Sequence, residues 1–295
     1  MKSDGPSRGT RIAIEVDAGM VAGWRWRNDG APRLLFCHAN GFCASAYRRL
    51  FTALADRFDI IAPDLRGHGR TTLPAEPRRL KSWSVYGADI RALIDRLRPD
   101  WNPPYLLGGH SLGAVSVTLA AEGRSDIAGL MLIEPVAPPE IMTWIAGTPL
   151  WPLLSKRMPL VRGALSRRAE WPDRDAAAAA YGRKRLFSAW ADGCLADYLE
   201  DGLSERAGAL RLSCEPAWEA ANYAAMRQDF WRAVRVRPAP MQVLAADGRD
   251  TTVFLGARAR FRRAGVEVKM LDGVGHLVPM EKPHAAAEFL ASAGP

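Results

Sequence analysis

This chain of 295 residues lacks the signals of several specialised protein classes. It contains no run of about eighteen apolar residues that would cross a bilayer. No cluster of Lys and Arg with interleaved aromatic residues concentrates its formal net charge of +8 on one segment. A Walker loop, a dinucleotide fingerprint and clustered metal ligands are also missing. We therefore expect a small-molecule substrate, with no nucleic acid, no membrane, no metal and no cofactor, and we leave the oligomeric state open.

Cysteine is scarce, and its spacing argues against a disulfide framework. The four residues are scattered without a CxxC pair: Cys37, Cys43, Cys194 and Cys214. The opening residues, MKSDGPSRGT, are polar and lead into no apolar segment of the kind that a secretion signal needs. We therefore expect reduced, buried thiols and a cytoplasmic location.

What the chain does contain is the composition of a soluble globular protein, with 48% hydrophobic and 24% charged residues. Two alternating segments, 11–19 and 20–28, meet at a Gly-containing turn and predict an antiparallel hairpin. Short apolar runs of the buried-strand type then alternate with helical patterns. The runs cover 33–39, 58–64, 104–110, 127–135, 240–248 and 266–273, and the helical patterns cover 46–57, 84–98, 112–123, 251–264 and 283–293. This alternation predicts an α/β fold, with a mainly parallel sheet covered by helices on both faces.

The alternation disappears between Ala137 and Arg235, where proline-punctuated and Trp-containing helical segments predict an inserted, mostly helical cap. The expected division is 1–136 for the first part of the core, 137–235 for the cap and 236–295 for the second part of the core. Six tryptophans lie in this cap: Trp144, Trp151, Trp171, Trp190, Trp218 and Trp231. We expect them either to pack between cap and core or to form an apolar roof over a ligand.

Residues 109–113 read Gly-His-Ser-Leu-Gly, a GxSxG motif between an apolar strand and a helix-forming stretch. A sharp turn from strand to helix holds the serine backbone in a strained conformation, and side chains at the two glycine positions would collide with their neighbours. The turn lifts the serine oxygen above the sheet. Ser111 is therefore the candidate nucleophile.

Three further segments accompany this motif, in the order found in a known family. LLFCHANGF, DLRGHG and GVGHLVPMEKP resemble three segments of the α/β-hydrolase family: a strand and loop beginning with His and Gly, the loop after the next strand, and the segment with the catalytic histidine. The resemblance covers the whole chain except the cap. It implies the α/β-hydrolase fold and an esterase-like serine hydrolase, and it indicates fold and mechanism much better than substrate.

Serine is a poor nucleophile at its free pKa, so it needs an adjacent base. His276 follows a predicted strand in the Gly-rich loop GVGHLVP, which gives the mobility and access that a proton carrier needs. We expect His38, His68 and His110 to organise hydrogen bonds and His284 to lie on the surface. The base role is therefore assigned to His276.

The base in turn needs a supporting acid. Family members usually carry it a few residues after the preceding strand, so the resemblance implies Asp250 in the segment AADGRD. Asp247 is an alternative, because Ala246 stands where the family has Gly. Glu134, at the end of the apolar run over 127–135, is another, because some members carry the acid on the corresponding strand. Asp272 is too close to the base along one loop to be a strong rival.

Acyl transfer creates an oxyanion, and two backbone N–H groups are expected to face it. One belongs to Leu112, the residue after the candidate nucleophile. The family resemblance of the loop after LLFCH implies Asn40 as the second donor, with Gly41 or Phe42 as alternatives.

These features favour hydrolysis of a small to medium apolar carboxylic ester through an acyl-enzyme intermediate. One alternative is carbon–carbon bond hydrolysis of a ring-cleavage product, which cap arginines such as Arg183 and Arg185 would hold. Thioester, amide or perhydrolysis chemistry on the same triad is another. A ligand receptor without turnover is disfavoured by the apparent triad. Epoxide hydrolases and haloalkane dehalogenases of this fold carry Asp at the elbow, so Ser111 argues against both.

Overall fold

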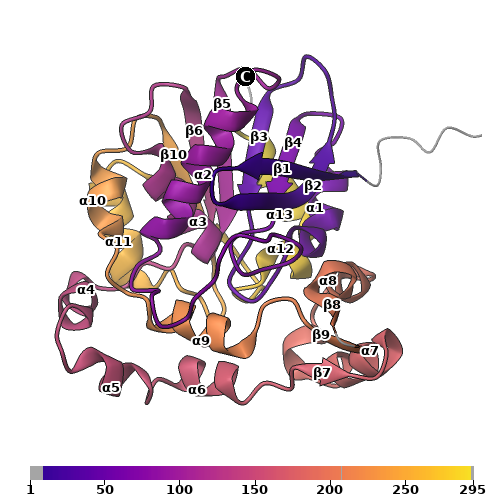
Figure 1. Ribbon diagram of the computed structural model, residues 1–295. Coiled ribbons are helices and arrows are strands. Elements are labelled where there is room, and N and C mark those ends of the chain that lie inside the picture. The colour runs from indigo at the N-terminus through magenta and orange to yellow at the C-terminus, as the bar shows by residue number, and fades with distance from the viewer. Residues whose placement is uncertain (1–8, 207, 294–295) are drawn as a thin grey trace, which may run out of the picture.

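The computed structural model describes residues 9–206 and 208–293, so most of the polar opening segment lies outside the described residues. Its centre is an eight-stranded sheet with the order β1-β2-β4-β3-β5-β6-β10-β11 (Figure 1). The strands are β1 (Thr10–Val16), β2 (Gly19–Trp26), β3 (Arg33–Cys37), β4 (Asp59–Pro63), β5 (Tyr105–His110), β6 (Ile127–Ile133), β10 (Met241–Ala246) and β11 (Glu267–Leu271). Strand β2 pairs antiparallel with β1 and β4, and the remaining pairs are parallel. The predicted α/β class with a mainly parallel sheet is confirmed.

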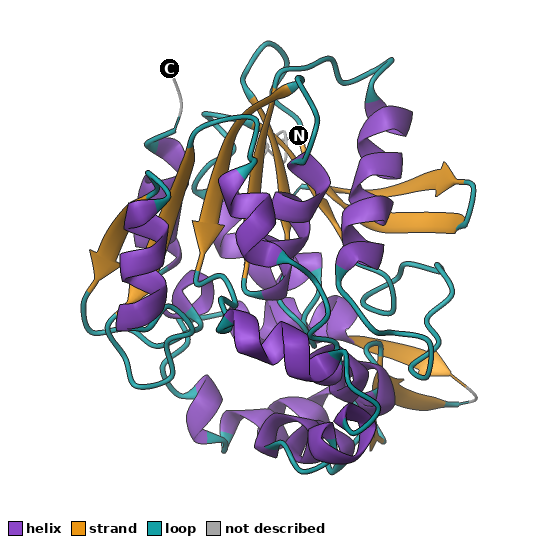
Figure 2. Cartoon of the chain, turned by 90° about the vertical axis from the view of Figure 1, so that its left-hand side faces the viewer, coloured by secondary structure: helices purple, strands orange, loops and turns teal. Residues whose placement is uncertain are grey.

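The parallel strands are buried on both faces, which explains their continuous apolar runs. In β3, Leu34 and Phe36 belong to one core cluster, whereas Leu35 and Cys37 belong to the other. Helices cover both faces of the sheet (Figure 2). One face carries α2 (Ser84–Leu97), α3 (Leu112–Ala121), α10 (Phe230–Arg235) and α11 (Leu255–Arg263), and the other carries α1 (Arg48–Thr52), α12 (Val278–Glu281) and α13 (Pro283–Ala291). The helix expected over 46–57 is shorter, because a 3-10 turn (Ala44–Tyr47) precedes α1 and turns follow it.

The insert after β6 lies along one side of this core (Figure 1). Its helices are α4 (Glu140–Ala146), α5 (Trp151–Ser155), α6 (Pro159–Leu165), α7 (Arg174–Gly182), α8 (Cys194–Gly202) and α9 (Pro216–Ala224), with a 3-10 turn at Arg185–Phe187. It also contains a three-stranded antiparallel sheet made of β7 (Glu170–Trp171), β9 (Ala209–Leu212) and β8 (Leu203–Arg206). Helix α10, expected in the cap, packs on α3, and its Trp231 ring lies 4.9 Å from the ring of Phe261 in α11.

Burial separates the cap tryptophans into two groups. Trp144 is 80% exposed, whereas the other five are at most 9% exposed. Three of the buried indoles donate their N–H to backbone carbonyls. These contacts support packing as the main role of Trp151, Trp218 and Trp231.

Two further properties concern the chain as a whole. All four cysteines are buried and unpaired, as expected. Across residues 9–206 and 208–293, no helix is both long and apolar enough to cross a membrane.

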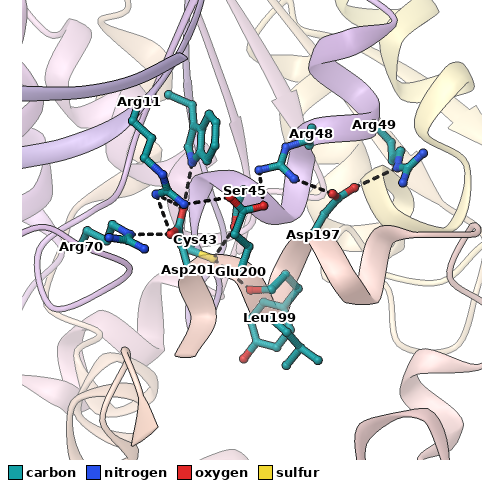
Figure 3. A network of polar contacts seen from close by, with 12 residues as sticks. Arg11, Cys43, Ser45, Arg48, Arg49, Arg70, Asp197, Leu199, Glu200 and Asp201 are labelled. Carbon is teal, nitrogen blue, oxygen red and sulfur yellow. Dashed lines mark hydrogen bonds and ion pairs between the residues drawn. The ribbon is translucent and has the colours of Figure 1, made fainter. Parts of the chain in front are cut away.

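Helix α8 joins the cap to the core through buried carboxylates (Figure 3). Asp201 accepts hydrogen bonds from Arg11, Arg70 and the indole N–H of Trp24, at 2.6 to 2.9 Å. Desolvation alone would raise the pKa of Asp201, but the hydrogen bonds from Arg70, Trp24 and Arg11 outweigh it and hold this pKa below its usual value. One turn earlier, Asp197 binds arginines of α1 in the same way. The cap is therefore attached to the core by charge-assisted hydrogen bonds as well as by apolar contacts.

Replacing Asp201 by Ala tests this attachment. The carboxylate is fully buried while Arg11 and Arg70 are 38% and 55% exposed, so solvent screens part of the loss. We expect the free energy of unfolding to fall by about 2 to 3 kcal/mol at neutral pH, measured by urea titration. The difference should shrink as the pH falls below about 4 and through the lowered pKa of Asp201, where the wild-type carboxylate also becomes neutral.

The neighbouring Glu200 provides the matched control. It pairs with Arg11 and Arg48, but its side chain is 36% exposed. Glu200→Gln should cost less than about 1 kcal/mol. Equal losses in the two variants would show that burial of the Asp201 carboxylate is not what anchors the cap.

Candidate active site

Ser111 lies in the turn between β5 and α3, where the motif places it. Its backbone has φ 55° and ψ −115°, a conformation that a residue with a side chain rarely adopts. A Cβ atom on Gly109 would lie 2.5 Å from the backbone of Gly113, and one on Gly113 would collide with the carbonyl of Cys37. The two glycines therefore permit the tight approach of strand, helix and neighbouring loop that the turn requires.

A chain of hydrogen bonds leads from Ser111 to a buried carboxylate. The Oγ atom of Ser111 lies 3.0 Å from Nε2 of His276, and Nδ1 of His276 lies 3.0 Å from Oε2 of Glu134. Because a carboxylate only accepts, Nδ1 carries the proton and leaves Nε2 free to accept the serine proton. The structure thus joins the candidate nucleophile, the candidate base and a buried carboxylate in one hydrogen-bonded row.

Glu134 directly follows β6 and is fully buried. Its Oε1 atom accepts hydrogen bonds from the N–H of Ala246 and the hydroxyl of Thr251, and Oε2 accepts one from the N–H of Thr252. Its backbone has φ 46°, and in the described chain only Ser111 shares a positive φ among residues other than glycine. Strained backbone persists where surrounding contacts determine it, and here it occurs at both ends of the Ser111–His276–Glu134 row.

The loop that carries His276 is fixed by three separate contacts. Asp247 accepts the N–H of Gly273 at 2.9 Å, and Glu281 accepts the N–H of Gly275 at 2.8 Å. His110 lies 2.9 Å from the carbonyl oxygen of His276 through its Nε2 atom. These contacts determine where the imidazole of His276 stands.

His110 also connects this loop to the loop after β3. Its Nδ1 atom accepts the hydroxyl proton of Tyr47, which in turn accepts the N–H of Ala39. Burial lowers the pKa of His110 well below its usual value, and the nearby His276 adds to the effect. His110 therefore stays neutral and acts as a structural bridge.

The two backbone N–H groups expected to face an oxyanion, those of Leu112 and Asn40, differ from their neighbours in their hydrogen bonds. Leu112 is the first residue of α3, so its N–H has no acceptor within the helix. In the loop after β3, Gly41 donates its N–H to His68 and Phe42 donates to the carbonyl of Ala39. Within the described residues, the N–H of Asn40 donates to no protein acceptor, which favours Asn40 over the two alternatives.

The comparison with protein families agrees with this geometry. The model described as the Alpha/beta hydrolase family matches residues 34–289. The chain belongs to the α/β hydrolase family.

Several known hydrolases are similar to parts of this chain. A 2-(acetamidomethylene)succinate hydrolase of Mesorhizobium japonicum is 36% identical over 124 residues, covering 42% of each protein. Protein phosphatase methylesterase 1 of Mus musculus is 33% identical over 109 residues, covering 36% of this chain and 28% of that protein. These matches therefore span less than half the length of either relative. The crystal structure of an E-2-(acetamidomethylene)succinate hydrolase superposes with a TM-score of 0.75 at 22% identity, over 96% of this chain and 98% of that one, which shows the shared fold.

The structure places one predicted site residue, Asp250, away from the His276 imidazole. Asp250 was expected against His276, but its side chain is exposed and lies beside Gly248 and Gly275 instead. The hydroxyl and backbone donors of Thr251 and Thr252, the next two residues, point to the carboxylate that follows β6. The segment after β10 thus supplies donors to the acid, while the longer side chain of Glu134 reaches the histidine.

The other histidines are placed as expected, in hydrogen-bonded loops or on the surface. His38 accepts the N–H of Leu65 and His68 that of Gly41, and burial lowers the pKa of both, that of His68 to about 4. His284 is exposed. In the described part of the chain, no group of three or more His, Cys, Asp or Glu residues is arranged to hold a metal ion.

The donors that hold the Glu134 carboxylate were not predicted from the sequence. The adjacent Thr251 and Thr252 were the available signal, because threonine hydroxyls and turn amides satisfy a buried carboxylate. They lie more than a hundred residues from Glu134 in the sequence, so local sequence patterns could not predict the contact.

Replacing Glu134 by Gln distinguishes the two acids. This change keeps the size of the side chain but removes the negative charge, so His276 loses the partner that orients it and stabilises its protonated form. We expect kcat on an activated ester to fall by about a thousandfold or more, with secondary structure preserved by circular dichroism. Asp250→Asn should change kcat by less than about threefold. If Asp250→Asn were the more damaging variant, the acid would lie after β10.

Proposed function

We propose that this protein is a serine hydrolase that cleaves a small to medium apolar carboxylic ester through an acyl-enzyme intermediate. Ser111 is the nucleophile, His276 the general base and Glu134 the acid. The observation that carries the proposal is the pair of 3.0 Å contacts that joins these three side chains.

The reaction proceeds in two halves. As Ser111 Oγ attacks the ester carbonyl carbon, its proton passes to Nε2 of His276, and Glu134 stabilises the resulting imidazolium. The ester C–O bond then breaks, and the leaving alcohol takes that proton. Water repeats the sequence: it gives a proton to His276, attacks the acyl carbon and releases the carboxylic acid, and Ser111 recovers its proton. These steps need no cofactor.

The negative charge of each tetrahedral intermediate requires donors that are in place beforehand. The N–H groups of Leu112 and Asn40 are proposed for this task. Fixed donors of this kind contribute about 3 to 4 kcal/mol each to transition-state stabilisation. Asn40 is held by the cap, because its Nδ2 atom donates to the carbonyl of Glu219 in α9 at 3.1 Å.

The loop after β3 that carries Asn40, called the oxyanion loop below, lies beside aromatic side chains. These side chains favour a substrate with an apolar acyl group. The ring of Phe42 lies 5.8 Å from that of Trp190 and 5.4 Å from that of Tyr198, both in the cap. Phe187 packs against Trp190 at 4.6 Å. Trp190 is therefore the cap tryptophan best placed to contact substrate, whereas the other buried ones serve packing.

A second candidate is an acyl compound that carries a carboxylate. Arg183 and Arg185, considered for this role from the sequence, are exposed. The cation next to the oxyanion loop is Arg167, which donates to Glu219 at 2.7 Å while both lie against Gly41. Burial raises the pKa of Glu219 and so favours its neutral form, although Arg167 opposes the rise. One relative is named for a succinate substrate, which agrees with this candidate.

The cytoplasm is the proposed location, supported by four buried, unpaired cysteines. Residues 137–235 stay the proposed cap, with α10 packed on the core. The proposed partner is the small-molecule substrate.

A series of activated esters with increasing acyl length tests the proposed reaction, with hemisuccinate esters as the anionic arm. We expect turnover of neutral esters by the wild type and a loss of at least about ten-thousandfold in kcat for Ser111→Ala. The double variant Ser111→Ala, His276→Ala should be no worse than the first change alone, because the two residues act as a unit.

Ser188→Ala, which removes an exposed cap serine, serves as the control and should retain full activity. If Ser111→Ala kept more than about a hundredth of the wild-type kcat, the nucleophile assignment would fail. A higher kcat/KM for the hemisuccinate arm than for neutral esters of equal length would replace the first candidate with the second.

A further inference from the structure

The cap segment from Ile141 to Ala169 has a positive net charge. It contains five basic residues and no Asp or Glu: Lys156, Arg157, Arg162, Arg167 and Arg168. Within the described residues, no ion pair involves the first three, and all three are exposed. Several other exposed arginines pair with a carboxylate, among them Arg27, Arg70 and Arg232.

The same segment exposes large apolar side chains. They are Ile141 (58% exposed), Trp144 (80%), Leu150 (66%), Leu153 (58%), Leu154 (40%), Leu160 (59%) and Leu165 (55%). The other nine tryptophans of the chain are at most 9% exposed, so the position of Trp144 is unusual for this protein. Contiguous apolar surface surrounded by charge marks a site of interaction.

We call the exposed side chains of α4, α5 and α6, together with Leu150 directly before α5, the outer face of these helices. The three helices lie in a row along the margin of the cap farthest from the sheet (Figure 1). Their inner face is already occupied: Trp151 is buried and donates to the carbonyl of Ala224 in α9, and Val161 and Ala164 pack with Ala220. The outward residues are therefore not needed for packing the cap.

We infer that the outer face of α4, α5 and α6 docks on the surface of an anionic phospholipid bilayer. Trp144 and the leucines enter the boundary between headgroups and acyl chains, where an indole with an apolar body and a polar N–H is favoured. Lys156, Arg157 and Arg162 bind the phosphate-bearing surface. No membrane partner was expected from the sequence, since a sequence alone does not show which of these apolar side chains are exposed.

Charge decides between a bilayer and a second copy of this chain. A symmetric dimer through this face would place the same patch on both subunits and bring the two cationic segments together. The one acidic residue of α4, α5 and α6, Glu140, already pairs with Arg235 and Arg260 of its own chain. An anionic bilayer offers both an apolar layer and the opposite charge. The proposal concerns a contact surface and does not depend on which bond the active site cleaves.

Vesicle binding by the full chain tests the charged half of this surface. Sedimentation with phosphatidylcholine vesicles, with and without phosphatidylglycerol, should show binding that requires the anionic lipid and weakens with salt. Lys156→Gln with Arg157→Gln should lower the partition coefficient by roughly twentyfold. The matched control, Arg262→Gln with Arg263→Gln, removes two exposed cations from α11 and should change it less than about twofold.

Fluorescence tests the apolar half. Vesicles with brominated acyl chains quench only indoles that enter the bilayer, so the quenched part of the emission should disappear in Trp144→Leu. Trp144→Ser should weaken binding, whereas Leu255→Ser, which alters a residue that is also 80% exposed, should leave it unchanged.

Three results would overturn the inference. They are no binding to anionic vesicles, an equal loss in the matched charge variants, or unquenched Trp144. Self-association that Trp144→Ser abolishes, without vesicle binding, would assign the face to a dimer instead. Ester turnover in solution should be unchanged in all of these variants, since none alters the active site.

Discussion

The hydrogen bonds of the buried Glu134 carboxylate are the interaction on which the proposed active site depends. It leaves the end of β6, receives donors from Ala246 and the Thr251–Thr252 pair after β10, and binds His276 after β11. One side chain thereby fixes the relative positions of three parallel strands at the edge where the site lies. A fully buried carboxylate is stable only when its oxygens are satisfied, so the donors are as necessary as the charge.

Carboxylates also determine how the cap meets the core. Asp201 and Asp197 of α8 bind arginines that come from the first 70 residues, and Glu219 of α9 connects the cap to the loop of Asn40 through its backbone carbonyl. The oxyanion loop is thus bonded to the cap on one side and, through Tyr47 and His110, to the loop of His276 on the other. A movement of the cap would therefore shift Asn40, one of the two proposed oxyanion donors. This connection links substrate entry to catalytic geometry.

Local sequence patterns were sufficient for most of the core. Continuous apolar runs predicted the parallel strands, and the GxSxG motif predicted the turn at Ser111. Both signals depend on residues that are adjacent in the chain. The acid was different: Asp250 stands where the family usually has it, yet the choice between it and Glu134 depends on how donors from distant segments are shared. The small sheet of the cap and the docking of α10 on α3 were also missed, since weak local patterns there are overridden by tertiary contacts.

The central claim is that His276 and Glu134 activate Ser111 as a nucleophile. The most direct test is to treat the protein with a fluorophosphonate and to locate the adduct by mass spectrometry. The account predicts one phosphonyl group per chain, bound to Ser111 Oγ and formed much more slowly when Glu134 is replaced by Gln. An adduct on another residue, or labelling of Ser111 at an unchanged rate in that variant, would contradict it.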